Sequence, residues 1–150
     1  MKFAILVAVV SLTAGTASAQ TSGPLEWRRT DMSSDTPGAT AFTAEVDGIR
    51  RAVVAIRAPV DRTSQAGTFR GVVFQTEVRC QERRWRITGI TYYAADYSVV
   101  SQTGAVPEAP LARETPLHVA VTDVCDGGHM GPVGLTTDDP VQVQRWLDGL

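Results

Sequence analysis

The clearest pattern in the chain is an alternation of apolar and polar residues over Phe69–Tyr93. One side of the run Val72–Cys80 is apolar apart from a threonine, and the other side is mostly polar. A period of two is typical of a strand with one buried face. The polar residues 81–84 interrupt the pattern, which resumes from Trp85 to Tyr93. The stretch therefore predicts a long antiparallel hairpin around which the fold is organised.

Shorter alternating segments surround this hairpin. Leu25–Thr30, Thr40–Val46 and Ile49–Ala58 predict further strands, the last covered on both sides, and Ser98–Ser101 predicts a short one. Asp47-Gly48 suits a tight turn, because glycine takes the positive φ that such turns need. Segments rich in polar or turn-forming residues are expected to be loops, namely 31–38, 59–68, 102–114 and 126–137.

The hydrophobic period changes after Thr115-Pro116, a pair suited to begin a helix by capping and by a preset φ. From Leu117 to Cys125 the apolar side chains share one helical face. Asp139-Pro140 repeats this signal before a second apolar stripe that ends at Leu150. We expect an α+β fold, with a small antiparallel sheet of about five or six strands, a short packed helix and a short C-terminal helix.

Residues 1–19 have the pattern of a cleavable secretory signal: one lysine, a short apolar run and the small residues Ala17-Ser18-Ala19. The apolar run is shorter than the roughly 20 residues that span a bilayer, which disfavours an uncleaved anchor. After cleavage we expect no membrane insertion and a periplasmic or secreted product. Residues 20–24 are expected to be a disordered N-terminus, 25–126 a disulfide-linked sheet domain, and 127–150 a loop and short helix packed on the same domain.

Cys80 and Cys125 are the two cysteines of the chain. In an exported protein they most simply form one disulfide, and two free thiols or metal thiolates are the alternative. The predicted helix places Cys125 on its buried face, where it can meet Cys80. The formal net charge of −2 at pH 7 gives no long-range attraction to nucleic acid or to anionic lipid.

The segment between the cysteines resembles the surface-adhesin protein E-like domains of proteobacteria. The shared elements are a cysteine after a strand, an arginine-containing strand that ends in tyrosine, a Val-Val-Ser segment, and a proline-opened helix closed by a second cysteine. In this chain they are Cys80, Arg84 and Arg86, Tyr92 and Tyr93, Val99-Val100-Ser101, Thr115-Pro116-Leu117 and Cys125. The resemblance implies a sheet packed with a short helix, pinned by a Cys80–Cys125 disulfide. The type member of the family is a surface lipoprotein that binds host matrix proteins.

Candidate chemistry is sparse. His118, Cys125, His129 and Met130 are residue types that suit copper, but the disulfide uses the thiol, and adjacent residues are awkward joint ligands. His118 and Asp123 are five residues apart and lie on different sides of a helix, so they do not form a catalytic pair. The sequence contains no phosphate loop, nucleophile elbow or dinucleotide fingerprint. We expect no enzyme activity, no metal and no cofactor.

An arginine-rich segment at the predicted turn is the candidate partner-binding site. Guanidinium forks suit carboxylates and phosphates, and tryptophan adds a stacking surface. The alternative is a solvated turn whose arginines pair with Glu77 and Glu82. The segment consists of Arg83, Arg84, Trp85 and Arg86.

The sequence thus predicts an exported, non-enzymatic envelope protein that acts as an interaction, adhesin-like or structural module. Its partner is expected to be an envelope or extracellular protein. The alternative is a periplasmic protein that binds a small molecule in a pocket between sheet and helix. The sequence leaves the identity of the partner and the oligomeric state open.

Overall fold

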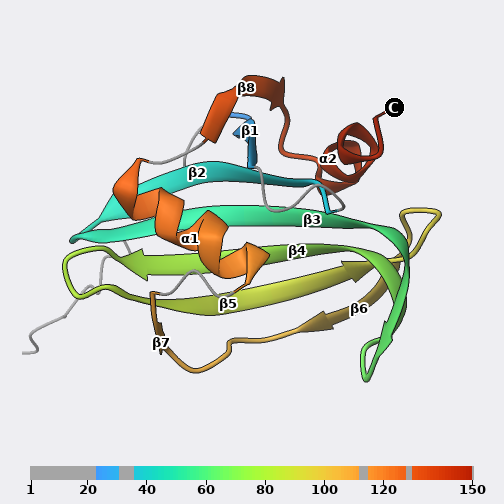
Figure 1. Cartoon of the computed structure of the whole chain (residues 1–150), viewed down its shortest axis with the longest axis horizontal. Coiled ribbons are helices and arrows are strands. Elements are labelled where there is room, and N and C mark those ends of the chain that lie inside the picture. Colours follow the sequence, from blue (N-terminus) through green and yellow to red (C-terminus); the bar gives the residue numbers. More distant parts are fainter. Residues whose placement is uncertain (1–22, 31–35, 112–114, 128–129, 150) are drawn as a thin grey trace, which may run out of the picture.

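The computed structural model describes residues 23–30, 36–111, 115–127 and 130–149 (Figure 1). The predicted signal peptide, most of the predicted disordered N-terminus and His129 lie outside the described residues. In chain order the elements are β1 (Glu26–Thr30), β2 (Gly38–Val46), β3 (Ile49–Ser64), β4 (Gly67–Arg79), β5 (Arg84–Tyr93), β6 (Val99–Thr103), β7 (Ala109–Pro110), α1 (Pro116–Asp126), β8 (Met130–Thr136) and α2 (Pro140–Leu147).

The strands form one antiparallel sheet in the order β6-β5-β4-β3-β2-β1-β8, and β7 pairs separately with β5. The predicted hairpin is β4–β5, near the middle of the order, and β3 pairs along its other side. The α+β class and the antiparallel sheet agree with the prediction. The sheet has eight strands, however, where the sequence predicted about five or six.

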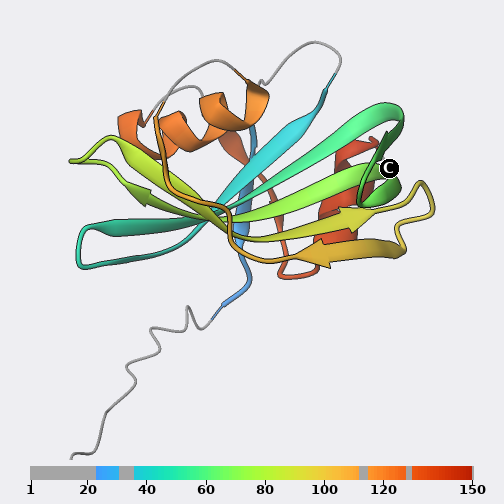
Figure 2. The same cartoon turned by 90° about the horizontal axis from the view of Figure 1, so that it is seen from below.

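Two apolar clusters lie on opposite faces of this sheet. Val54 and Ala55 are neighbours in the chain but belong to different clusters, as do Val72 and Val73. Successive side chains of a strand point to opposite faces, so β3 and β4 are covered on both sides. The expectation of one buried face was therefore right for the ends of β4 but wrong for its middle. Helix α1 packs on one cluster and α2 on the other (Figure 2).

The predicted loop 59–68 is largely strand, and the predicted loop 102–114 contains two short strand segments. Within 59–68, β3 continues to Ser64 and β4 begins at Gly67, so the turn is only two residues long. This extension is solvent-exposed on most of its side chains and lacks the apolar alternation that marks a half-buried strand. The pairing is also irregular between Arg57 and Arg62, where Pro59 has no N–H to donate. Within 102–114, β6 runs on to Thr103 and β7 pairs with the start of β5.

The glycine-rich segment 126–137, also predicted to be a loop, contains β8. Strand β8 pairs with β1 at the edge of the sheet, where proline is tolerated. Gly134 lies against the indole of Trp146 on α2, and a Cβ at this position would overlap that ring. Here glycine indicates close packing with a helix and not the loop that the sequence predicts.

Both helices begin as predicted. The Thr115 side chain caps α1 by accepting from the His118 N–H at 3.2 Å, and Asp139 caps α2 by accepting from the Val141 N–H at 2.8 Å.

Cys80 and Cys125 form a disulfide with a Cα–Cα distance of 5.3 Å, which confirms the predicted pair and excludes free thiols. Neither described helix is long and apolar enough to cross a membrane.

Candidate functional site

The structure separates the four residues of the predicted arginine-rich site. Trp85 is only 5% exposed and packs in the cluster under α1. Arg84 and Arg86 flank it in β5 and therefore point to the opposite face of the sheet. Arg83 lies in the β4–β5 turn at φ 54° and pairs with Asp126 at 2.7 Å. The indole is thus part of the core, and only the arginines remain on the surface.

Register brings two further arginines beside Arg84 and Arg86. Arg51 of β3 lies opposite Glu77 of β4, which lies opposite Arg86 of β5. Cross-strand partners share a face of the sheet, so these three side chains form one row. Arg79 and Arg84 face each other two residues further along. We call Arg51, Arg79, Arg84 and Arg86 the arginine cluster.

Two carboxylates, those of Glu77 and Glu108, form ion pairs with arginines of this cluster. Glu77 accepts from Arg51 at 3.2 Å and from Arg86 at 2.6 Å, and Glu108 accepts from Arg84 at 2.9 Å. The Glu77 and Glu108 side chains are 14% and 29% exposed, whereas those of the four arginines are between 39% and 50% exposed. The guanidinium groups therefore cover the carboxylates that hold them, and the face presents mainly positive charge.

Part of this pairing agrees with the solvated-turn alternative. That alternative predicted ion pairs with Glu77 and Glu82, and the Arg86–Glu77 and Arg79–Glu82 pairs are present. The Arg79–Glu82 pair is loose, at 3.6 Å, and Glu82 is 60% exposed. The alternative did not foresee Arg51, or Glu108 as a second brace. An exposed pair such as Arg79–Glu82 contributes little to stability on its own, so its effect is chiefly to position the guanidinium group.

The electrostatics of Glu77 reflect this bracing. Burial alone would raise the pKa of its carboxyl, but the hydrogen bonds and charges of Arg86 and Arg51 together outweigh burial and lower the pKa. The carboxylate is therefore ionised throughout the neutral and mildly acidic range. Over this pH range its negative charge holds the guanidinium groups of Arg51 and Arg86 in place.

The surface beside the cluster is a hollow of about 350 Å³ on the same face, lined by both polar and apolar residues. Thr43 and Thr88 line it at two irregularities of the sheet, where β2 and β5 each carry an extra residue relative to the neighbouring strand. Such bulges bend a strand and re-aim its side chains. Gln75 lies between them, with its side-chain oxygen over Gly89. The arginine cluster thus borders a concave, hydroxyl- and amide-lined surface.

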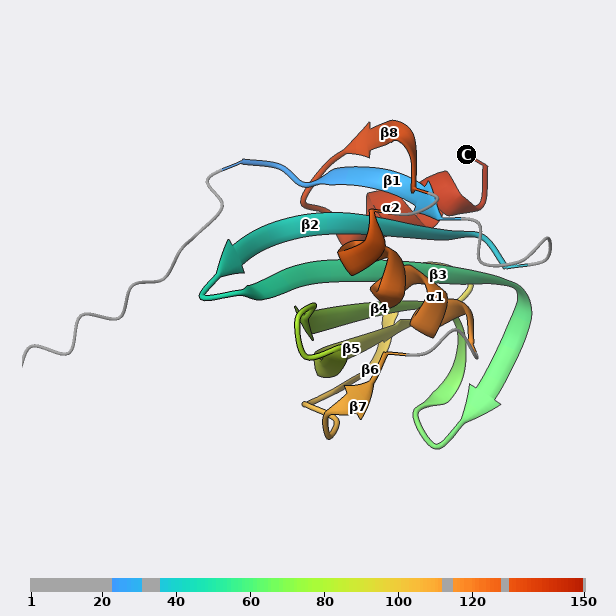
Figure 3. The same cartoon turned by 60° about the vertical axis from the view of Figure 1, so that its left-hand side comes forward.

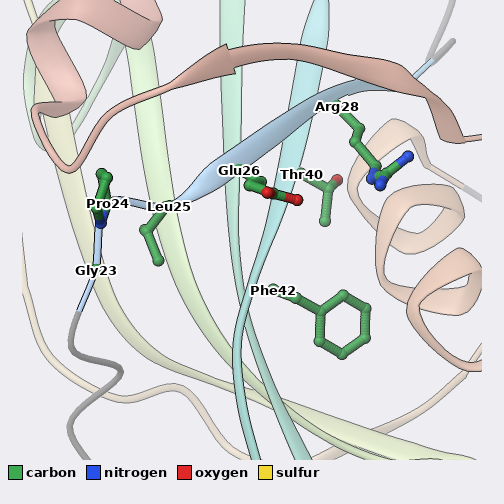
Figure 4. A pocket seen from close by; sticks show the side chains of 7 residues that line it. All are labelled: Gly23, Pro24, Leu25, Glu26, Arg28, Thr40 and Phe42. Carbon is green, nitrogen blue, oxygen red and sulfur yellow. The ribbon is translucent and has the colours of Figure 1, made fainter.

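A second groove, of about 440 Å³, lies on the α1 side of the sheet over β1 and β2 (Figure 4). Leu25 and Phe42 give it an apolar part, and Phe42 is 43% exposed. Its polar lining includes Arg28, whose guanidinium donates to the Gly131 carbonyl at 3.3 Å. The guanidinium of Arg50 lies 5.9 Å from the Phe42 ring and also donates to the Val124 carbonyl. The arginines near this groove are thus engaged within the fold.

Among the described residues, those weighed for catalysis or metal binding are not assembled into a site. His118 packs edge-to-face on Trp85 with ring centroids 5.3 Å apart, and Asp123 is fully buried on the same helix. Cys125 is in the disulfide, while His129 and the Met130 side chain lie outside the described part of the chain. Over that described part, no group of three or more potential ligands could hold a metal ion.

The signal that could have separated the predicted site is the period of two itself. Trp85 belongs to the same apolar series as Ile87, so its neighbours Arg84 and Arg86 must lie on the other face. Arg51 could not be found this way, because its place beside Glu77 depends on the β3–β4 register.

Comparisons with family models, with curated proteins and with solved structures found no match for this chain.

Proposed function

We propose that this chain is an exported, non-enzymatic interaction module that docks an acidic segment of a partner protein on its arginine cluster. The observation that carries the proposal is the cluster of four exposed guanidinium groups, which cover two less exposed carboxylates. Each guanidinium has five N–H donors, and the ion pairs here use only one or two of them. Within the described part of the chain, the remaining donors of these guanidinium groups are left over for a second set of carboxylates.

The spacing of the cluster suits an extended peptide. Arg84 and Arg86 are two residues apart on one strand, which separates them by about 7 Å along it. Alternate side chains of an extended partner have the same spacing, so two acidic residues in an i, i+2 pattern can pair with both arginines. Because the guanidinium groups are already held in place, less side-chain entropy is lost on binding.

Export is supported by two independent features. The disulfide between Cys80 and Cys125 is typical of oxidising compartments, and residues 1–19 have the pattern of a secretory signal. The resemblance to the surface-adhesin protein E-like family, whose members are small exported proteins, agrees with the same compartment. We therefore propose an envelope or extracellular protein as the partner.

Charge reversal tests the proposal, with Arg83 as a matched control. The chain from Gln20 would be immobilised and incubated with envelope extract, and a fluorescent glutamate-rich peptide would serve as a direct probe. We expect R84E/R86E to lose capture and peptide binding, and the wild-type signal to fall with salt, because screening acts beyond about 8 Å at physiological ionic strength.

The control variant R83E makes the same kind of charge change off the cluster, where Arg83 pairs with Asp126. It should bind like the wild-type protein. Equal binding by wild-type, R83E and R84E/R86E proteins, all with unchanged melting temperatures, would contradict the proposal. The arginines would then form only a solvated, internally paired face.

A further inference from the structure

An apolar pocket of about 250 Å³ lies on the other face of the sheet, between the first turn of α1 and β5. Helix α1 lies across the sheet, and the segment from β6 to β7 runs beside β5 (Figures 1 and 3). Val106 of this segment donates its N–H to the Ile87 carbonyl at 2.9 Å, and its side chain is 41% exposed at the pocket. The pocket is lined mainly by Trp85, Ile87, Val106, Pro107, Leu117 and His118.

The wall of this pocket contains two buried polar atoms without hydrogen-bond partners. Trp85 Nε1 and His118 Nδ1 are shielded from solvent, and neither has a partner in the described part of the chain. A buried donor or acceptor left unpaired costs about 1–3 kcal/mol, so native proteins contain few of them. The two rings contact each other edge-to-face, which places both unpaired groups in one region of the wall.

We propose that the pocket binds a small neutral aromatic molecule with one hydroxyl group, of about the size of a methylphenol. A cavity of about 150 Å³ is known to hold benzene, so the larger volume here suits one substituted ring. The apolar lining disfavours a charged ligand, which would lose its hydration without a counter-charge. Arg86, at the border of the pocket, already pairs with Glu77.

The hydroxyl follows from the two unpaired atoms. A hydroxyl oxygen accepts from the indole N–H of Trp85, while its own hydrogen is donated to His118 Nδ1 in the tautomer protonated at Nε2. Both atoms are covered, so the ligand enters by displacing part of the wall. Apart from Arg86, which borders the pocket, the arginine cluster lies on the opposite face of the sheet.

Calorimetry and thermal shift with three probes test the assignment: 4-methylphenol, toluene and 4-methylcyclohexanol. A ligand that binds only the folded state raises its melting temperature. We expect 4-methylphenol to bind at least fivefold more tightly than either of the other probes. W85F keeps an aromatic ring but removes the N–H, so it should bind 4-methylphenol and toluene with similar affinity. Equal affinity of the wild-type protein for these two probes overturns the proposal.

Substitutions that fill the pocket with a larger side chain test whether the ligand binds there. A109L adds volume to the lining, and V106F does so at an exposed position in case A109L folds poorly. Both should abolish binding, while A95L, in the exposed β5–β6 turn, should keep it. No binding by the wild-type protein, or undiminished binding by the folded A109L or V106F variant, overturns the proposal. These outcomes are separate from those that test the arginine cluster.

Discussion

Arg57 and Asp148 join the middle of the sheet to the end of α2 through an ion pair that is buried on the arginine side. The Arg57 guanidinium is 1% exposed, and its Nε lies 3.0 Å from both carboxylate oxygens of Asp148. The remaining nitrogens donate to the carbonyls of Ala94 and Ala95 in the β5–β6 turn. Tyr97 stacks on the guanidinium and donates its hydroxyl to Asp148 at 2.8 Å. One arginine thus fastens β3, a turn and a helix end together.

Replacement of Asp148 by asparagine should strongly destabilise the protein. Breaking a buried pair leaves an uncompensated charge, and the Asp148 side chain is itself 25% exposed, so we expect a loss of about 3 kcal/mol, the lower end of the usual range. The measurement is the free energy of unfolding in urea. D138N is the matched control at a nearby exposed aspartate and should change stability little. A D148N variant as stable as D138N would show that the pair contributes nothing net.

Removal of the disulfide should also lower stability. Cys80 and Cys125 are 45 residues apart, and closing a loop of that length removes unfolded-state entropy worth about 4 kcal/mol in the chain-entropy model. The pair also ties the C-terminal end of α1 to the end of β4. Guanidinium unfolding of oxidised protein and of the C80A/C125A variant measures the effect. Coincident unfolding curves would mean that the loop is already constrained without the bond.

The features that the sequence predicted correctly have local signals. The alternation in β2 to β5 reports a strand with a covered face, and the capping residues of α1 and α2 lie next to the helices that they begin. The disulfide was predictable because the chain has two cysteines and the pattern of an exported protein. None of these inferences requires knowledge of which strands are neighbours.

The features that were missed depend on long-range packing. Strand β8 is defined by two packing relationships. It pairs with β1, which lies about a hundred residues earlier in the chain, and its Gly134 contacts Trp146 of α2. The arginine cluster likewise exists only because Arg51, Glu77 and Arg86 share one register across three strands. A sequence pattern fixes the face of a side chain within its own strand but not the strand that lies beside it.

The stabilising effect of Glu77 should depend on pH. Arg86 and Arg51 lower the pKa of its carboxyl below the reference value of 4.5, despite the opposing effect of burial. A carboxyl with a lowered folded-state pKa stabilises the protein fully above its unfolded pKa, and this contribution is lost as the pH falls through the folded-state pKa. Relative to E77Q, the wild-type protein should therefore be more stable at pH 7, by about 1–2 kcal/mol, with the advantage shrinking below about pH 4.5.

Urea unfolding of wild-type and E77Q proteins at about pH 7, 5 and 3 measures this dependence. The matched control is E45Q, because Glu45 is 54% exposed and pairs with Arg50, which is 33% exposed. That exposed pair should contribute less than about 1 kcal/mol at any of these pH values. A difference between wild-type and E77Q proteins that stays constant down to pH 3, or grows as the pH falls, would contradict the assignment. Glu77 would then act through packing, and its charge would not be what holds Arg51 and Arg86 in place.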